Sequence, residues 1–124
     1  MPFVPASEAV VYDMHGLRFV SYAASARGSR ELCAWRGELP AGTAGPPHRI
    51  SREEVFLVLS GRVDLTIDGE TRSLDPGDVA IAPPGSSLEV SNATKEPATM
   101  WVTTSIGLKA SLADGSQIAP PWAN

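Results

Sequence analysis

The chain has 124 residues, of which 43% are hydrophobic, and this is enough for one domain with a substantial core. It carries 10 Lys and Arg against 14 Asp and Glu, a formal net charge of −4. Because binding to nucleic acid depends on clustered basic residues, which this sequence lacks, we expect no nucleic-acid partner. No apolar run is long enough to span a membrane, and the first residues lack the basic start and long apolar segment of a secretion signal. We therefore expect a cytoplasmic protein with no membrane partner.

Other features of the composition narrow the class of protein. Cys33 is the only cysteine, which excludes an intramolecular disulfide and the cysteine-based zinc modules. The 11 Gly and 11 Pro residues recur at short intervals, which argues against a helix bundle. Alanine is abundant and arginine outnumbers lysine, a bias that is typical of high-GC bacteria.

In chain order, a Pro-rich segment at residues 1–12 comes first and predicts an arm that packs on the fold or frays. Segments with alternating apolar residues, separated by turn residues, then predict an antiparallel sandwich or barrel. The expected strands cover residues 17–22, 31–39, 53–60, 63–67, 71–74, 78–82, 87–92 and 98–104. Asp68-Gly69 predicts a two-residue hairpin with two positive φ angles. A second arm follows at residues 113–124.

The expected strand over residues 53–60 has two apolar faces. Alternation sends Glu54, Phe56 and Val58 to one side, and Val55, Leu57 and Leu59 to the other. If Glu54 points inward, the second face needs cover from an arm or from another subunit, and we expect a homodimer.

The inward face of the strand over residues 31–39 is ambiguous from the sequence. Arg36 faces the interior if the even positions do, whereas Cys33 and Trp35 do so if the odd positions do. Cys33 is more simply a small core residue than a nucleophile, because nothing in its surroundings predicts a lowered pKa.

Two stretches match known motif spacings. The stretch from Gly42 to Gly61 resembles the first cupin motif, which reads Gly, five residues, His-x-His, three or four residues, Glu, six residues, Gly. The stretch from Gly77 to Asn92 resembles the second, which reads Gly, five residues, Pro-x-Gly, two residues, His, three residues, Asn. The resemblance covers about residues 31–104. It implies an all-β fold, a single antiparallel, jelly-roll-like cupin β-barrel forming one domain over residues 1–124.

The same resemblance implies where a metal would be held. Cupins typically bind a divalent metal with three His and one Glu, and these positions correspond to His48, Ile50, Glu54 and Leu88. Since isoleucine and leucine cannot donate a lone pair, half of the ligand set is missing. We therefore expect no tightly bound metal and no other cofactor.

A histidine and a carboxylate remain beside an apolar pocket, and we expect His48 and Glu54 to be the catalytic residues. Burial would raise the pKa of Glu54, and the pair could then transfer protons to and from a small organic ligand. The other expected pocket residues are Ile50, Phe56, Val58, Leu88, Met100 and Arg36.

Three functional hypotheses follow from the resemblance. The first is a metal-independent isomerase, cyclase or dehydratase of bacterial small-molecule metabolism that uses the His/Glu pair. The alternative is a non-catalytic binding or sensor protein, in which the pair only orients a ligand. A metal-dependent oxygenase is the least favoured, because two ligand positions are replaced.

Overall fold

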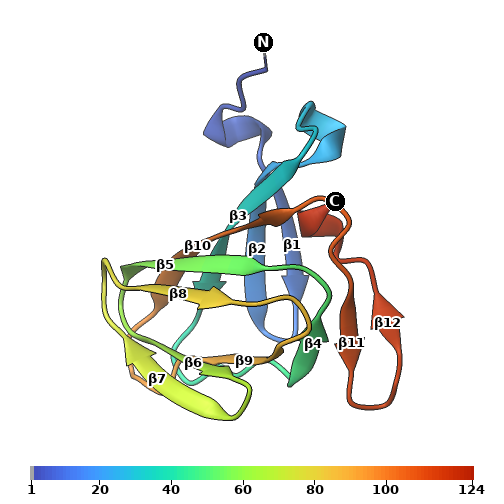
Figure 1. Cartoon of the computed structure of the whole chain (residues 1–124). Coiled ribbons are helices and arrows are strands. Elements are labelled where there is room, and N and C mark those ends of the chain that lie inside the picture. Colours follow the sequence, from blue (N-terminus) through green and yellow to red (C-terminus); the bar gives the residue numbers. More distant parts are fainter. Residues whose placement is uncertain (1) are drawn as a thin grey trace.

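The computed structural model describes residues 2–124 of the chain, which form two facing antiparallel sheets (Figure 1). In order across the first sheet, the strands are β1 (Val10–Met14), β2 (Leu17–Ala23), β3 (Leu32–Leu39), β10 (Ala98–Ser105), β5 (Glu54–Ser60) and β8 (Val79–Ala82). Across the second they are β12 (Gln117–Ile118), β11 (Ala110–Leu112), β4 (His48–Ile50), β9 (Ser87–Ser91), β6 (Val63–Ile67) and β7 (Glu70–Leu74).

Short 3₁₀ segments complete the fold: η1 (Ala6–Glu8), η2 (Ser25–Arg27) and η3 (Pro121–Ala123). Within the described residues, no helix is long and apolar enough to cross a membrane. The fold is therefore all-β, as the sequence predicts.

The eight strands expected from the sequence are all present, and their ends differ by one residue at most. Regular structure also extends into both segments that were predicted as arms, because β1 begins at Val10 and β12 lies at Gln117–Ile118. The short strands β4 and β11 were not predicted either. Three residues are too few for an alternating pattern to stand out from a turn.

Two tight hairpins have consecutive positive φ angles, and the one at Asp68-Gly69 was predicted from the sequence. Asp68 and Gly69 have φ angles of 49° and 83° between β6 and β7. His15 and Gly16, between β1 and β2, have φ angles of 55° and 78°. Two consecutive positive φ angles define the type I′ turn, whose twist matches that of the flanking strands.

Gly61, which follows β5, is required for a second reason besides its positive φ of 72°. A Cβ atom at this position would lie 2.5 Å from the Pro97 carbonyl oxygen and 2.8 Å from Ala98. Only glycine allows the chain to pass this close to the start of β10.

The core lies between the two sheets and follows the alternation of the strands. In β5, Glu54, Phe56 and Val58 are only 4%, 2% and 1% exposed, whereas Val55 and Leu57 are half-buried and Leu59 is exposed. The predicted inward face of this strand is therefore confirmed. Alternate residues of this strand thus face the interior between the two sheets.

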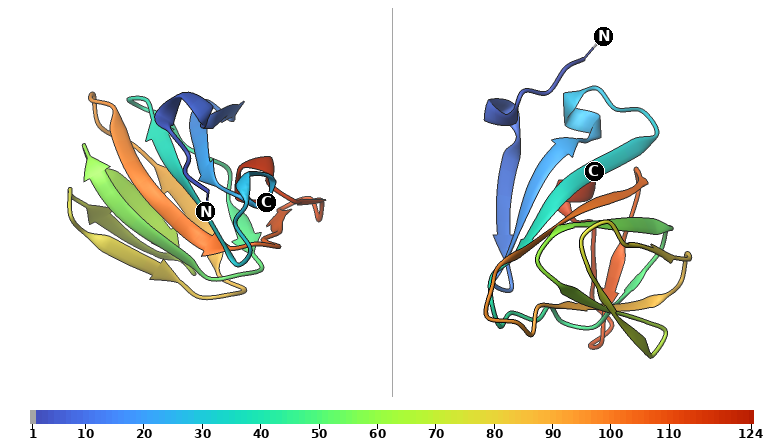
Figure 2. Two further views of the ribbon diagram at one scale, coloured as in Figure 1. Left: turned by 90° about the horizontal axis from the view of Figure 1, so that it is seen from above. Right: turned by 90° about the vertical axis from the view of Figure 1, so that its left-hand side faces the viewer.

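The last residues of the chain close one side of the interior. Trp122, in η3, stacks on Phe19 of β2 with ring centroids 3.8 Å apart, and its carbonyl oxygen accepts a hydrogen bond from Ser21. In Figure 2 this end of the chain lies against the sheet near β1–β3, while the N-terminal segment projects away from the sheets. The C-terminal segment thus becomes part of the interior wall.

Candidate functional site

An apolar cavity lies between the sheets. Its volume is about 100 Å³. β5, β10 and β3 contribute to one wall, and β4, β9 and β11 to the other. The lining residues are Met14, His15, Leu17, Phe19, Trp35, Gly45, Pro46, His48, Ile50, Glu54, Phe56, Leu88, Val90, Met100, Val102, Leu108, Ala110, Leu112, Ile118, Pro120 and Trp122.

The cavity has a deep end and a mouth. His15 is exposed, and Pro46, Leu112 and Ile118 are partly exposed, so these residues surround the opening. Glu54, in contrast, is only 4% exposed. A molecule entering between the β1–β2 turn and the β11–β12 hairpin would therefore pass the apolar wall before it reaches the carboxyl group.

His48 begins β4 and is partly buried in the cavity wall. Its Nδ1 atom lies 3.1 Å from the carbonyl oxygen of Pro46. Because a carbonyl oxygen only accepts, this contact requires a proton on Nδ1. When the ring is neutral, Nε2 then carries the free lone pair, so the backbone selects the tautomer that can accept a proton there.

Glu54 begins β5 and faces the cavity from the opposite sheet. Burial raises the pKa of this carboxyl from 4.5 to about 8, since the ion would be cut off from water. At neutral pH the group is therefore mostly protonated, and it can donate a proton. An uncharged carboxylic acid can remain in an apolar wall far more easily than a carboxylate.

The two groups face one cavity without binding each other. Across the described residues, neither a hydrogen bond nor an ion pair joins His48 to Glu54. Each side chain is thus free to contact a molecule placed between them. A proton donor and a proton acceptor that share one site are what general acid–base chemistry needs.

The structure brings together most of the predicted site residues. Ile50, Phe56, Leu88 and Met100 line the same cavity as His48 and Glu54. Val58 is also inward and 1% exposed, but it packs in the core and does not line the cavity.

Arg36 was expected to line the pocket, and that placement is wrong. The odd positions of β3 point inward, so Cys33 and Trp35 are buried while Arg36 lies on the outer face. There it forms an ion pair with Glu38 at 3.0 Å and contacts the hydroxyl of Tyr22. The outer positions of β3 begin with the apolar residues Leu32 and Ala34, so alternation at the start of the strand did not separate its two faces.

Several lining residues were missed from the sequence, above all those of the first two strands and the C-terminal segment. Leu17 and Phe19 alternate in β2 and could have been assigned to the interior by their period. Trp122 carries no periodic signal, because it lies in a Pro-rich segment outside any strand. Its only sequence signal is a large aromatic residue in an otherwise polar tail.

Cys33 is a core residue, as the sequence predicts. It is fully buried, and burial together with the nearby Glu54 raises the pKa of its thiol to about 11. The thiol is within hydrogen-bond distance of two carbonyl oxygens, and the shorter contact, 2.9 Å, is to Ala123 rather than Thr104. Such a thiol is not a nucleophile at neutral pH.

The residues present do not fit a tightly bound divalent metal. Ile50 and Leu88 contribute only hydrocarbon to the wall beside His48. Over residues 2–124, the structure contains no group of three or more His, Cys, Asp or Glu side chains that could hold a metal ion. One histidine and one buried carboxyl provide fewer than the three protein ligands that catalytic zinc sites use.

Two facing antiparallel sheets that enclose a cavity define the class of fold. The sequence profile of the family described as "Cupin domain" matches residues 35–105, more than half of the chain. The protein belongs to this family. A search of curated protein sequences gives no match.

Solved structures with the same fold belong to proteins that are named for different activities. The polyketide cyclase RemF from Streptomyces resistomycificus has a TM-score of 0.75 at 17% identity, covering 85% of this chain and 79% of that one. A sugar phosphate isomerase of the cupin superfamily from Silicibacter pomeroyi has a TM-score of 0.73 at 18% identity, covering 96% and 93%. A Cupin 2 conserved barrel domain protein from Salinispora arenicola has a TM-score of 0.70 at 25% identity, covering 84% and 87%. These similarities establish the fold. The chemistry has to be inferred from the residues of the site.

Proposed function

We propose that this is a cytoplasmic bacterial protein that binds a small, uncharged organic molecule between its sheets, where His48 and Glu54 transfer protons to and from it. The observation that carries the proposal is a buried, unpaired carboxyl group and a tautomer-fixed imidazole on opposite walls of one apolar cavity. Isomerisation, cyclisation and dehydration all need this combination of acid and base.

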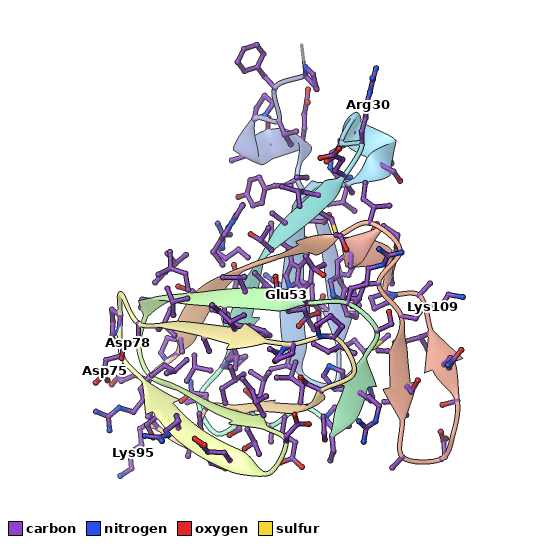
Figure 3. All side chains as sticks on the ribbon, in the orientation of Figure 1. Arg30, Glu53, Asp75, Asp78, Lys95 and Lys109 are labelled. Atoms are coloured by element: carbon purple, nitrogen blue, oxygen red, sulfur yellow. The ribbon has the colours of Figure 1, made fainter. Side chains whose placement is uncertain are left out.

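The charge of the cavity wall favours an uncharged ligand over a phosphorylated one. Among the described residues that line the cavity there is no Lys or Arg. In Figure 3 the labelled Arg30, Lys95 and Lys109 lie at the periphery of the molecule, and all three are exposed. A phosphate in this cavity would have no cation to pair with, which is costly in an apolar environment. A sugar phosphate, the substrate class for which the Silicibacter pomeroyi isomerase is named, therefore fits this site poorly.

A carbonyl compound illustrates how the two groups would act. The carboxylic acid of Glu54 gives its proton to the carbonyl oxygen while Nε2 of His48 takes a proton from the adjacent carbon, and an enol results. If the carbonyl compound has a β,γ double bond, this enol is a dienol. His48 then returns the proton to the γ carbon while the enol hydroxyl returns its proton to Glu54, and the conjugated isomer results. Both groups end in their starting state, and no other reactant is consumed.

The acid–base step can be tested with acetophenone as a small, uncharged carbonyl probe. In D₂O the protein should accelerate exchange of the methyl protons of acetophenone for deuterium, followed by NMR. We expect Glu54→Gln and His48→Phe each to lower the catalysed rate by about 100-fold or more. Glu89→Gln, on the exposed side of β9, is a matched control that should leave the rate within about twofold.

The outcome separates the two main functional hypotheses. Exchange that persists in both Glu54→Gln and His48→Phe would contradict the acid–base proposal. Tight binding without any exchange in the unchanged protein would instead favour the binding or sensor protein, for which substitutions at the pair alter only affinity.

We also propose a homodimer formed through the outer face of β5 and β8. Leu59, Val79 and Ile81 on this face are 46%, 53% and 59% exposed, and Val55 and Leu57 lie beside them. The C-terminal segment packs on the opposite side of the sheet and does not cover them. A charge in this face, as in Leu57→Glu, should shift the protein to monomer or aggregate, whereas Thr71→Glu on the exposed strand β7 should not. Light scattering that finds the unchanged protein monomeric at high micromolar concentration would contradict the dimer.

A further inference from the structure

Trp35 contains a buried polar atom without a partner. Across residues 2–124, its indole Nε1 is the one side-chain nitrogen or oxygen atom that is itself fully shielded from solvent and has no hydrogen-bond partner. The Glu54 carboxyl also has no partner among these residues, but it faces the cavity. The residue is 3% exposed and lines the cavity from β3. Buried polar groups are nearly always hydrogen-bonded in folded proteins. An unpaired donor on a residue that lines a cavity therefore indicates that a ligand could accept its hydrogen bond.

The polar groups of the surrounding strands are already engaged. Ser21, the cross-strand neighbour of Trp35 in β2, donates to the carbonyl oxygen of Trp122 and accepts from Arg27. Thr104, in the neighbouring inward row, donates to the backbone oxygen of Glu53 at 2.6 Å. The other cross-strand neighbour is Val102, which has no side-chain acceptor. The indole N–H therefore has no acceptor among these neighbours, and an acceptor atom on a molecule in the cavity would provide its partner.

We propose that the indole N–H of Trp35 is a specificity-determining hydrogen-bond donor, which binds an oxygen or nitrogen acceptor on a flat, uncharged, largely apolar ligand held beside Glu54. This inference rests on the proposed function, because it places the ligand in the same cavity. Indole only donates, so the ligand atom it binds must be an acceptor such as a carbonyl oxygen.

The shape of the ligand follows from the walls. Phe19 and Trp122 stack with an angle of 9° between their rings, and both line the cavity together with Phe56 of β5. The thioethers of Met14 and Met100 add soft, polarisable contacts. Aromatic and sulfur-containing walls pack well against a planar π-system.

The protonation of Glu54 agrees with an uncharged ligand. Because burial holds its pKa at about 8, the cavity contains two donors at neutral pH, the indole N–H and the carboxylic acid. Two donors in an apolar cavity select a ligand with acceptor atoms and reject a pure hydrocarbon, since the hydrocarbon leaves both donors unpaired.

A matched pair of probes tests the role of Trp35. Acetophenone and ethylbenzene have nearly the same shape, but only acetophenone has a carbonyl oxygen. In the unchanged protein we expect acetophenone to bind about 3- to 10-fold more tightly than ethylbenzene, as measured by ligand-observed NMR. In Trp35→Phe, which keeps an aromatic ring and loses the donor, this preference should fall to about twofold or less. Trp101→Phe makes the same substitution on the outer face of β10 and should keep the preference.

The indole proton itself gives a second measurement that needs no folded Trp35 variant. The chain has three Trp residues, and Trp101→Phe and Trp122→Phe assign the three indole N–H signals by elimination. Acetophenone should move the Trp35 N–H signal to lower field, and ethylbenzene should not. Binding of both probes with no such shift, or with an unchanged preference in Trp35→Phe, would overturn the role of Trp35 alone. If neither probe binds, the proposed cavity site fails together with it.

Discussion

Replacing Glu54 with glutamine should remove a strong pH dependence from the stability of this protein. In the unchanged chain, the folded state holds the proton of Glu54 up to about pH 8, whereas the unfolded chain releases it near pH 4.5. Between these values the folded state binds more protons than the unfolded state, so the free energy of unfolding falls as pH rises. The proton of Glu54 therefore contributes its full stabilisation of the folded state below about pH 4.5, and this stabilisation is lost by about pH 8.

The expected size of this effect is large for a single carboxyl. Each unit of pKa difference corresponds to about 1.4 kcal/mol, so Glu54→Gln should be more stable than the unchanged protein by on the order of 5 kcal/mol at pH 9. Near pH 4.5 the two proteins should be about equally stable, because a neutral carboxyl and an amide have similar shape and polarity. Urea unfolding of both at pH 4.5, 6.5 and 9 measures the difference.

Glu89→Gln is the matched control, since Glu89 is an exposed glutamate on β9. It keeps every other titrating group and should retain the pH dependence of the unchanged protein. Equal slopes of stability against pH in Glu54→Gln and Glu89→Gln would show that Glu54 is ionised in the folded state. That result would also remove the proton donor from the proposed mechanism.

The sequence was informative where a residue's environment depends on strand alternation. Glu54, Phe56 and Val58 share one face because side chains alternate along a strand, and the hairpin at Asp68-Gly69 follows from local backbone preference. These features depend on neighbours in the chain. The sequence therefore predicted the eight longer strands between residues 17 and 105 to within a residue of their observed ends.

The sequence was uninformative where contacts depend on residues far apart in the chain. The inward face of β3 depends on which side the opposite sheet covers, so Arg36 could not be assigned from β3 alone. Trp122 reaches the cavity by stacking on Phe19, a contact that spans most of the chain. The unpaired N–H of Trp35 appears only once all of its potential partners have been located.

Introducing histidine at both apolar positions of the candidate ligand set should create a metal site. His48 and Leu88 are direct cross-strand partners in β4 and β9, whose Cβ atoms lie about 5 Å apart in such pairs. Ile50 follows His48 by two residues on the same face, and Glu54 faces them from the other sheet. Ile50→His/Leu88→His should therefore bind about one Zn²⁺ per chain at micromolar concentration or below, whereas the unchanged protein should take up little, as measured by elemental analysis after dialysis.

Two control variants test whether Zn²⁺ binds in the cavity. Adding His48→Phe to the double variant removes one of three imidazoles and should weaken Zn²⁺ binding by about 100-fold. Val79→His/Ile81→His places the same number of new histidines on the outer face of β8, where no buried carboxyl faces them, and should bind Zn²⁺ far more weakly. If the cavity variant folds but takes up no Zn²⁺, Ni²⁺ or Mn²⁺, then Ile50 and Leu88 do not occupy ligand positions. In that case the proposed roles of His48 and Glu54, which depend on the same motif spacing, lose their support from the cupin resemblance.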